Sequence, residues 1–186
     1  VNDIDCYRVV FINGRYSSWL SETTHSGFDV CTLGSAWKKY AHHIEPHFGQ
    51  LTEDLGALVQ LNTALAWDGL YVRVPNGVTL DKPIQALYFT TGDQPIFNQT
   101  RSLIILGENA QAEIIERHQS LTTAQSWTNA VDEVFMGAGA RMHWVKLQHD
   151  EASAALTQHS VVHQKQDSHA TVHTISTDGK FLRNNL

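Results

Sequence analysis

The sequence has few of the residues that mark secreted, membrane or nucleic-acid-binding proteins. Its 186 residues include two cysteines, Cys6 and Cys31, which form no Cys-x-x-Cys pair and are too few for a disulfide scaffold. We therefore expect two inert thiols in a reducing cytoplasm. No apolar run approaches the roughly 20 residues of a membrane span. The first residues also lack the basic and apolar segments of a signal peptide.

The sequence also has few basic residues and few catalytic motifs. The formal net charge is −6, from 13 Lys and Arg against 19 Asp and Glu, and the sequence has no basic run. It therefore gives little support for binding to nucleic acid. The sequence contains no nucleophile elbow, phosphate-binding loop or His-Glu-x-x-His metal motif. We predict that the protein is not an enzyme.

What the sequence does contain is an internal repeat, centred on residues 101–147. Two segments, RSLIILGENAQAEIIERHQSL and NAVDEVFMGAGARMHWVKLQHD, share an apolar run, a corner led by glycine and a second strand-like run. Gly107 and Gly137 lie 30 residues apart, and further steps of 30 reach Gly77 and Asp167. A fixed period of this length is typical of stacked structural units.

Within each copy, small or apolar residues occupy alternate positions, which is the period of a β-strand. Ala110 and Ala140 are equivalent in this alignment, as are Ile114 and Trp144. The pattern predicts a mainly β fold, a parallel β-helix with coils of about 30 residues that bury their apolar faces by stacking. The alternative is an antiparallel meander with a coincidental period. The intervening, mostly polar positions should face outward: Gln111, Glu113, Arg141, His143, Thr171 and His173.

The residues before the repeat predict a small α+β region, 1–66, ahead of the β-helix, 67–186. In this first region Tyr7–Tyr16 reads as a β-hairpin, because Asn13 and Gly14 both adopt positive φ readily in a tight turn.

Two helices follow the hairpin. We predict that Ser35 caps the first helix and Thr52 the second. Asp54 then lies in the first turn of the second helix, where the helix dipole favours an acidic side chain.

Stacked coils align equivalent side chains into columns about 4.8 Å apart per step. One outward column is predicted to hold Glu113, His143 and His173. Imidazole and carboxylate groups in such a ladder could bind a metal ion or relay protons, and the alternative is a solvated polar face. Most of the 11 histidines are expected to be scattered solvated side chains. A second predicted column holds Arg73, Leu103, Glu133 and His163.

Several longer segments resemble a known family. They are LNTALAWDGLYVRVPNGVTLDKPIQALYF, RSLIILGENAQAEIIERH, QSWTNAVDEVFMGAGARMHWVKLQ and ISTDGKFLRNNL, preceded by VVFINGRYSSWLS. Together they resemble the SufB/SufD family of iron–sulfur cluster assembly proteins, most like its SufD branch, over nearly the whole chain.

The resemblance implies a right-handed parallel β-helix and the role of a scaffold subunit in a Suf-type complex. In such a complex the SufD-like subunit pairs with a SufB-like paralogue and a SufC-like ATPase. Its own contribution is structural and concerns iron acquisition, while the assembled complex handles iron or the Fe–S cluster. We expect no cofactor in this chain, a cytoplasmic location, and a homodimer as a further option.

The resemblance carries no functional residue onto this sequence. The family's assembly Cys and His lie in later coils and its SufC-binding segment later still, so we expect a fragment truncated at its C-terminus. The family's N-terminal helical region is expected before Val1, and Cys6 and Cys31 are not the assembly cysteine. Two alternatives stay open: a free-standing β-helix metal-binding module, and a β-helix carbohydrate-active enzyme.

Overall fold

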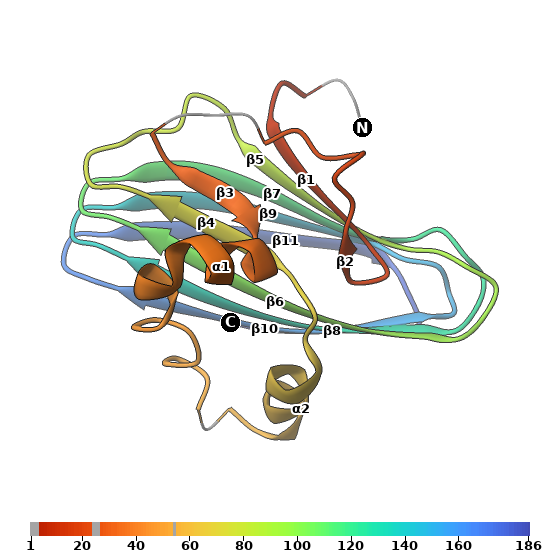
Figure 1. The fold of residues 1–186 in the computed structure, drawn as a ribbon. Helices are drawn as coiled ribbons and strands as arrows, with labels where there is room; N and C mark the ends of the chain where they lie inside the picture. The colour runs from red at the N-terminus through yellow and green to blue at the C-terminus, as the bar shows by residue number, and fades with distance from the viewer. Residues whose placement is uncertain (1–3, 24–26, 54) are drawn as a thin grey trace.

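In residues 4–23, 27–53 and 55–186, which the computed structural model describes, the chain forms two six-stranded sheets that face each other (Figure 1). In spatial order, sheet A contains β11 (His169–Asp178), β9 (Arg141–His149), β7 (Gln111–Ser120), β5 (Ile84–Thr90), β1 (Tyr7–Ile12) and β2 (Arg15–Tyr16). Sheet B contains β12 (Phe181–Asn185), β10 (Ala154–Gln164), β8 (Ser126–Met136), β6 (Ile96–Leu106), β4 (Leu70–Val74) and β3 (Asp29–Thr32).

From β4 onward the chain alternates between the two sheets. Each strand pairs in parallel with the equivalent strand of the next coil. The result is a β-solenoid of about four turns, which confirms the predicted parallel β-helix and excludes the antiparallel meander.

The coil length is 30 residues in the centre and shorter at the end. Ile84 pairs with Ile114 and Ile114 with Trp144, two steps of 30, as predicted. Trp144 then pairs with Val172, a step of 172 − 144 = 28. The corners stack backbone on backbone, since a Cβ on Gly137 would lie 2.6 Å from the Glu108 nitrogen. This close approach explains why the repeat is led by glycine.

The N-terminal residues extend both sheets. The predicted hairpin is confirmed, because β1 pairs with β2 antiparallel around Asn13 and Gly14, which have φ of 51° and 72°. Strand β1 also pairs in parallel with β5, and β3 pairs antiparallel with β4. The division into regions 1–66 and 67–186 stays a prediction.

Two helices contact the outer face of sheet B (Figure 1). The first, α1 (Leu33–Ile44), is capped by Thr32, whose hydroxyl accepts a hydrogen bond from the Ser35 nitrogen. The second, α2 (Ala57–Leu65), begins after Gly56 without a side-chain cap. The predicted caps Ser35 and Thr52 are therefore wrong.

Both errors have a physical cause. Thr32 and Ser35 are both residue types that cap helices. Thr32 is the N-cap because its backbone is still extended at the end of β3, as an N-cap residue requires. The Thr52 hydroxyl instead accepts from the buried Arg101. Asp54, predicted in the first helical turn, lies outside the described residues. No helix in the described part of the chain is long and apolar enough to cross a membrane.

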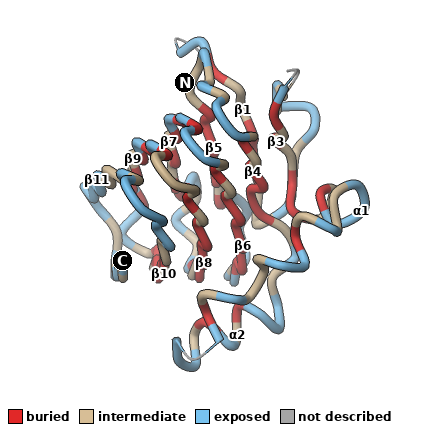
Figure 2. The backbone as a smooth tube through the Cα atoms, turned by 90° about the vertical axis from the view of Figure 1, so that its left-hand side faces the viewer, coloured by how far each residue is buried: buried red, intermediate tan, exposed pale blue. Residues whose placement is uncertain are grey.

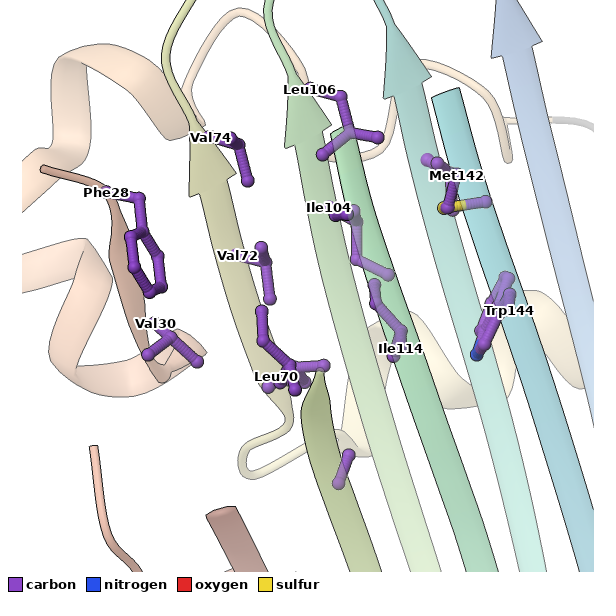
Figure 3. Close-up of a cluster of buried hydrophobic side chains, with 14 of the residues drawn as sticks. Phe28, Val30, Leu70, Val72, Val74, Ile104, Leu106, Ile114, Met142 and Trp144 are labelled. Atoms are coloured by element: carbon purple, nitrogen blue, oxygen red, sulfur yellow. The ribbon is translucent and has the colours of Figure 1, made fainter. Parts of the chain in front are cut away.

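An apolar core lies in one half of the space between the sheets, and part of it is drawn in Figure 3. Figure 2 shows that buried residues follow one another along the strands of both sheets. Ile114 and Trp144 project from sheet A toward Val72 and Ile104 of sheet B, and all four are at most 1% exposed. The inward apolar positions of neighbouring coils stack on one another, as the alternation predicts. This apolar half ends where the strands continue into a polar interior.

Candidate functional site

The other half of the interior is lined by charged and polar side chains. The alternation that buries Ile114 and Trp144 continues along β7 and β9, so the next inward residues are polar. The opposite strands β8 and β10 contribute polar groups to the same space. The side chains that form this polar interior are at most 4% exposed: Glu116, His118, Lys146, Gln148, Asp132, Gln158 and Ser160.

Two buried carboxylates lie close together in the polar interior. The amide nitrogen Nε2 of Gln158 donates to Glu116 Oε1 at 2.6 Å and to Asp132 Oδ2 at 2.8 Å, so one amide group bridges both acids. Glu116 Oε1 also lies 2.8 Å from His118 Nε2, and Asp132 Oδ2 accepts from Ser160 Oγ at 2.8 Å. Each acid therefore has at least two hydrogen-bond partners, as buried charge requires.

Lys146 supplies the positive charge opposite these acids. Its ammonium nitrogen lies 3.5 Å from Asp132 Oδ2 and donates a short hydrogen bond to Ser160 Oγ. It also lies over the Trp144 ring, 3.8 Å from the centroid, which is a cation–π contact. Lys146 therefore stands at the border between the apolar and polar halves.

The hydrogen bonds continue toward the last coil. Gln148 donates to Gln158 Oε1 at 3.2 Å, and it exchanges hydrogen bonds of 2.7 and 2.9 Å with Asn184 of β12. Ser176 Oγ donates to Gln148 Oε1 at 2.6 Å. These contacts join strands of both sheets, so the network ties successive coils together in one register.

The surroundings shift the pKa values of the two carboxyl groups in opposite directions. Burial raises the pKa of Glu116, but the hydrogen bond with His118 and the charge of Lys146 outweigh it and lower the pKa to about 2. Burial and the neighbouring charge of Glu116 raise the pKa of Asp132. Glu116 therefore stays ionised to lower pH than an ordinary glutamate, whereas Asp132 binds its proton at higher pH than an ordinary aspartate. Chemically, the interior holds ionisable groups that are hydrogen-bonded to one another and shielded from bulk water.

The predicted ladder lies elsewhere, on the outer face of sheet A. Glu113 pairs with His143 in register, and Glu113 Oε1 lies 3.6 Å from His143 Nδ1 with both side chains about half exposed. The short last coil places Thr171 beside His143, whereas His173 pairs with Val145. The rings of His143 and His173 still touch diagonally, with centroids 5.3 Å apart.

The metal-binding role of this ladder stays a prediction. In residues 4–23, 27–53 and 55–186, no three His, Cys, Asp or Glu side chains are grouped so that they could hold a metal ion.

The second predicted column is confirmed at its centre, where Leu103 pairs with Glu133 in register, and wrong at both ends. Leu103 pairs with Tyr71 and not Arg73, and Glu133 pairs with Val161 and not His163, because the first and last coils differ in length from the central ones. Glu133 is also fully buried, since the α1–α2 segment covers this face of sheet B. Its Oε2 accepts from Arg101 at 2.7 Å in an ion pair that the sequence reasoning missed.

The two cysteines have the surroundings of protonated thiols. Cys6 is buried and donates to Gln85 Oε1 at 3.6 Å, and burial raises its pKa. Burial raises the pKa of Cys31 to about 11. Iron and Fe–S clusters bind the thiolate form, so the raised pKa values disfavour the ligating form of both side chains in the metal-free chain.

Sequence reasoning did not identify the polar interior, although a signal was present. Counting in steps of two from Ile114 reaches Glu116 and His118, and from Trp144 it reaches Lys146. The same alternation that predicted the apolar core therefore also predicts buried charges. Their partners across the interior depend on how the two sheets face each other, which the pattern does not determine.

Comparison with known proteins gives the chain a family context. Residues 88–186 match the model described as SUF system FeS cluster assembly, SufBD core domain, and residues 1–86 match SufBD protein N-terminal region.

Curated proteins give concordant matches. A SufBD family iron–sulfur cluster assembly protein from Synechocystis is 27% identical over 96% of this chain and 42% of its own length. The iron–sulfur cluster assembly protein SufD from Escherichia coli is 27% identical over 98% of this chain and 42% of its own length. The chloroplastic protein ABCI7 from Arabidopsis thaliana is 28% identical over 68% of this chain and 28% of its own length. The chain therefore spans less than half the length of these relatives.

Proposed function

The chain belongs to the SufBD family of iron–sulfur cluster assembly proteins, and from this premise we propose that it acts as a SufD-like scaffold subunit of a Suf-type complex. The observation that carries the proposal is the pair of family matches over residues 1–86 and 88–186. The similarity to E. coli SufD over 98% of the chain supports the SufD-like assignment.

The physical properties of the chain suit a structural role. Its two sheets are tied together by buried hydrogen bonds across coils, so they form a stiff body on which partner surfaces can be held in place. Burial raises the pKa of both cysteines, which disfavours the reactive thiolate. We therefore propose that the chain itself is non-catalytic. Iron or the cluster is then a cargo of the assembled complex, and this subunit contributes to iron acquisition through its structure.

The proposed partners are a SufB-like paralogue and a SufC-like ATPase, and the proposed location is the cytoplasm. A decisive experiment co-expresses the tagged chain with both partners from the same genome and measures the stoichiometry of the purified complex. We expect all three proteins to co-purify in a fixed ratio. A tagged chain that purifies alone, or as a homodimer without either partner, would contradict the scaffold proposal.

Cluster assembly tests the non-catalytic part separately. Iron and acid-labile sulfide are measured after anaerobic reconstitution of the complex, of the partners without the chain, and of the chain alone. We expect clusters in the complex and none in the chain alone. Rapid cluster formation by the isolated chain would overturn the proposal.

A second candidate function is the metal-binding module. It is favoured by the contacts among Glu113, His143 and His173 on one face of sheet A. Anaerobic titration with Fe²⁺ or Zn²⁺ tests it, with the His143→Ala/His173→Ala variant as the comparison. A module of this kind predicts that the double variant loses one bound ion, and unchanged stoichiometry would exclude it. Replacement of the exposed His163 on β10 of sheet B by Ala provides a matched control away from this face. No observation in the described residues favours a carbohydrate-active enzyme.

A further inference from the structure

A groove crosses the outer face of sheet B beside α2. It has a volume of about 590 Å³, and its floor is formed by the first residues of β6, β8, β10 and β12. Leu58 of α2 and Pro95 form one side, while Lys180 and Arg183 line it toward β12. The groove lies outside the solenoid and is separate from the polar interior and from the histidine ladder.

The floor of the groove is an aromatic column with one gap. Phe97, Trp127, Ala155 and Phe181 are in register on four neighbouring strands. Phe97 and Trp127 stack with ring centroids 4.6 Å apart. Trp127 and Phe181 are two strand spacings apart, roughly 9.6 Å, with the small side chain of Ala155 between them. An inserted ring would lie about 4.8 Å from each neighbour, within the usual range for aromatic pairs.

Hydrogen bonds hold this groove in shape. Trp127 Nε1 donates to Thr157 Oγ1 at 3.0 Å, and Thr157 Oγ1 donates to Asn129 Oδ1 at 3.0 Å. Asn129 Nδ2 in turn donates to the Leu58 carbonyl at 2.8 Å, which fixes α2 against the sheet. Because the Trp127 indole and α2 are already held in position, binding would lose little side-chain conformational entropy.

The charge of the groove is opposite to that of the chain. Lys180 and Arg183 line it, and among the described residues no Asp or Glu does. The chain as a whole carries a formal charge of −6. Arg183 pairs in register with Thr157, so its side chain projects on the same face as Phe181, next to the gap above Ala155. The groove therefore favours an occupant that combines an aromatic ring with negative charge.

We propose that this groove binds an extended segment of a partner protein in which an aromatic side chain is flanked by Asp or Glu. The floor spans three strand spacings, roughly 14 Å, which equals about four residues of extended chain. Phe97 and Phe181 stay 45% and 52% exposed, so the groove contacts one face of its occupant. This suits a peptide lying on the surface better than a small molecule, which a typical pocket encloses almost completely.

Isothermal titration calorimetry of the chain with three unlabelled peptides tests the proposal. The probe is acetyl-Gly-Asp-Phe-Glu-Leu-Gly-amide, and its comparisons replace Phe by Ala, or Asp and Glu by Lys. We expect the probe to bind at least about tenfold more tightly than either comparison, a difference of about 1.4 kcal/mol. Its affinity should fall as NaCl is raised, because exposed charge pairs are screened.

Two variants locate the binding site. Ala155→Trp fills the gap between Trp127 and Phe181, and Arg183→Glu reverses the charge beside it. Each should weaken the probe at least about tenfold. The matched control is Lys165→Glu, which makes the same charge change at an exposed turn between β10 and β11 and should leave the affinity within about twofold.

Three results would overturn the proposal. The first is that no heat of binding is measured at about 1 mM probe, a concentration at which weak binding is already detectable. The second is that the Lys-containing peptide binds with the same affinity as the probe. The third is that Ala155→Trp binds the probe with unchanged affinity. Sedimentation equilibrium of the same samples tests whether a second copy of the chain occupies the groove instead of the peptide. A dimer that Ala155→Trp dissociates, without probe binding, would assign the groove to a second copy of the chain and reject the peptide.

Discussion

Replacing Glu133 by Gln is the sharpest test of what holds the helical segment to the solenoid. The Glu133 side chain is fully buried and its Oε2 lies 2.7 Å from the Arg101 guanidinium, which is 1% exposed. The backbone nitrogens of Gly49 and Leu51 also donate to this carboxylate, at 2.9 and 3.0 Å. One side chain thus connects β6, β8 and the segment between α1 and α2.

The expected magnitude follows from the burial of both charges. Glu133→Gln keeps the side-chain volume but leaves the Arg101 guanidinium buried without a counter-ion, which costs about 3–5 kcal/mol. Small domains are stable by about 5–15 kcal/mol, so the loss is a large fraction of the total. Replacing the whole pair, as Arg101→Met/Glu133→Leu, should recover part of this loss because no uncompensated charge remains, while the Gly49 and Leu51 nitrogens still lose their acceptor.

Urea denaturation followed by circular dichroism and tryptophan fluorescence measures these differences. The control is Glu151→Gln, a carboxamide replacement at an exposed position, which should change the free energy of unfolding by no more than about 0.5 kcal/mol. If Glu133→Gln lowers the free energy of unfolding by no more than this control does, the ion pair does not stabilise the fold. If the double variant is as unstable as Glu133→Gln, the lost stability comes from the Gly49 and Leu51 hydrogen bonds and not from the unpaired charge.

Two further predictions concern the interior and the coil stacking. The pKa of Glu116 is lowered in the folded chain from 4.5 to about 2, so its charge contributes stability above pH 4.5 that is lost as the pH falls through about 2. Urea denaturation at several pH values should therefore show a deficit of Glu116→Gln that narrows between pH 4.5 and 2, and a deficit independent of pH would contradict the assignment. A Cβ on Gly69 would lie 1.9 Å from the Arg101 carbonyl oxygen, so Gly69→Ala should destabilise the fold by at least about 3 kcal/mol. Gly34→Ala in α1, where the nearest atom is 3.6 Å away, is the control, and equal thermal midpoints for the two variants would refute the steric argument.

Part of the architecture is encoded in local sequence. Asn13 and Gly14 accept positive φ at low cost, so the hairpin at Tyr7–Tyr16 is readable without knowledge of the rest of the chain. The alternation around Ile114 and Trp144 and the 30-residue spacing of Gly107 and Gly137 predict stacked coils. These features are periodic because each coil must present the same apolar positions to its neighbours.

The register of the last coil depends on pairing between strands that are distant in sequence. A last step of 28 residues sets His173 beside Val145 and diagonal to His143, and a shift of two residues leaves the alternation of faces unchanged. The repeat pattern therefore cannot reveal it.

Burial was likewise decided in three dimensions. Glu133 occupies an outward position by its strand period, yet it is buried because a segment far away in sequence covers it. Glu116 and Asp132 become a coupled pair only where the two sheets face each other. Sequence by itself determined which face of a strand a residue occupies. The tertiary structure determined what covers that face, because contacts across coils and with the helices depend on register and not on local periodicity.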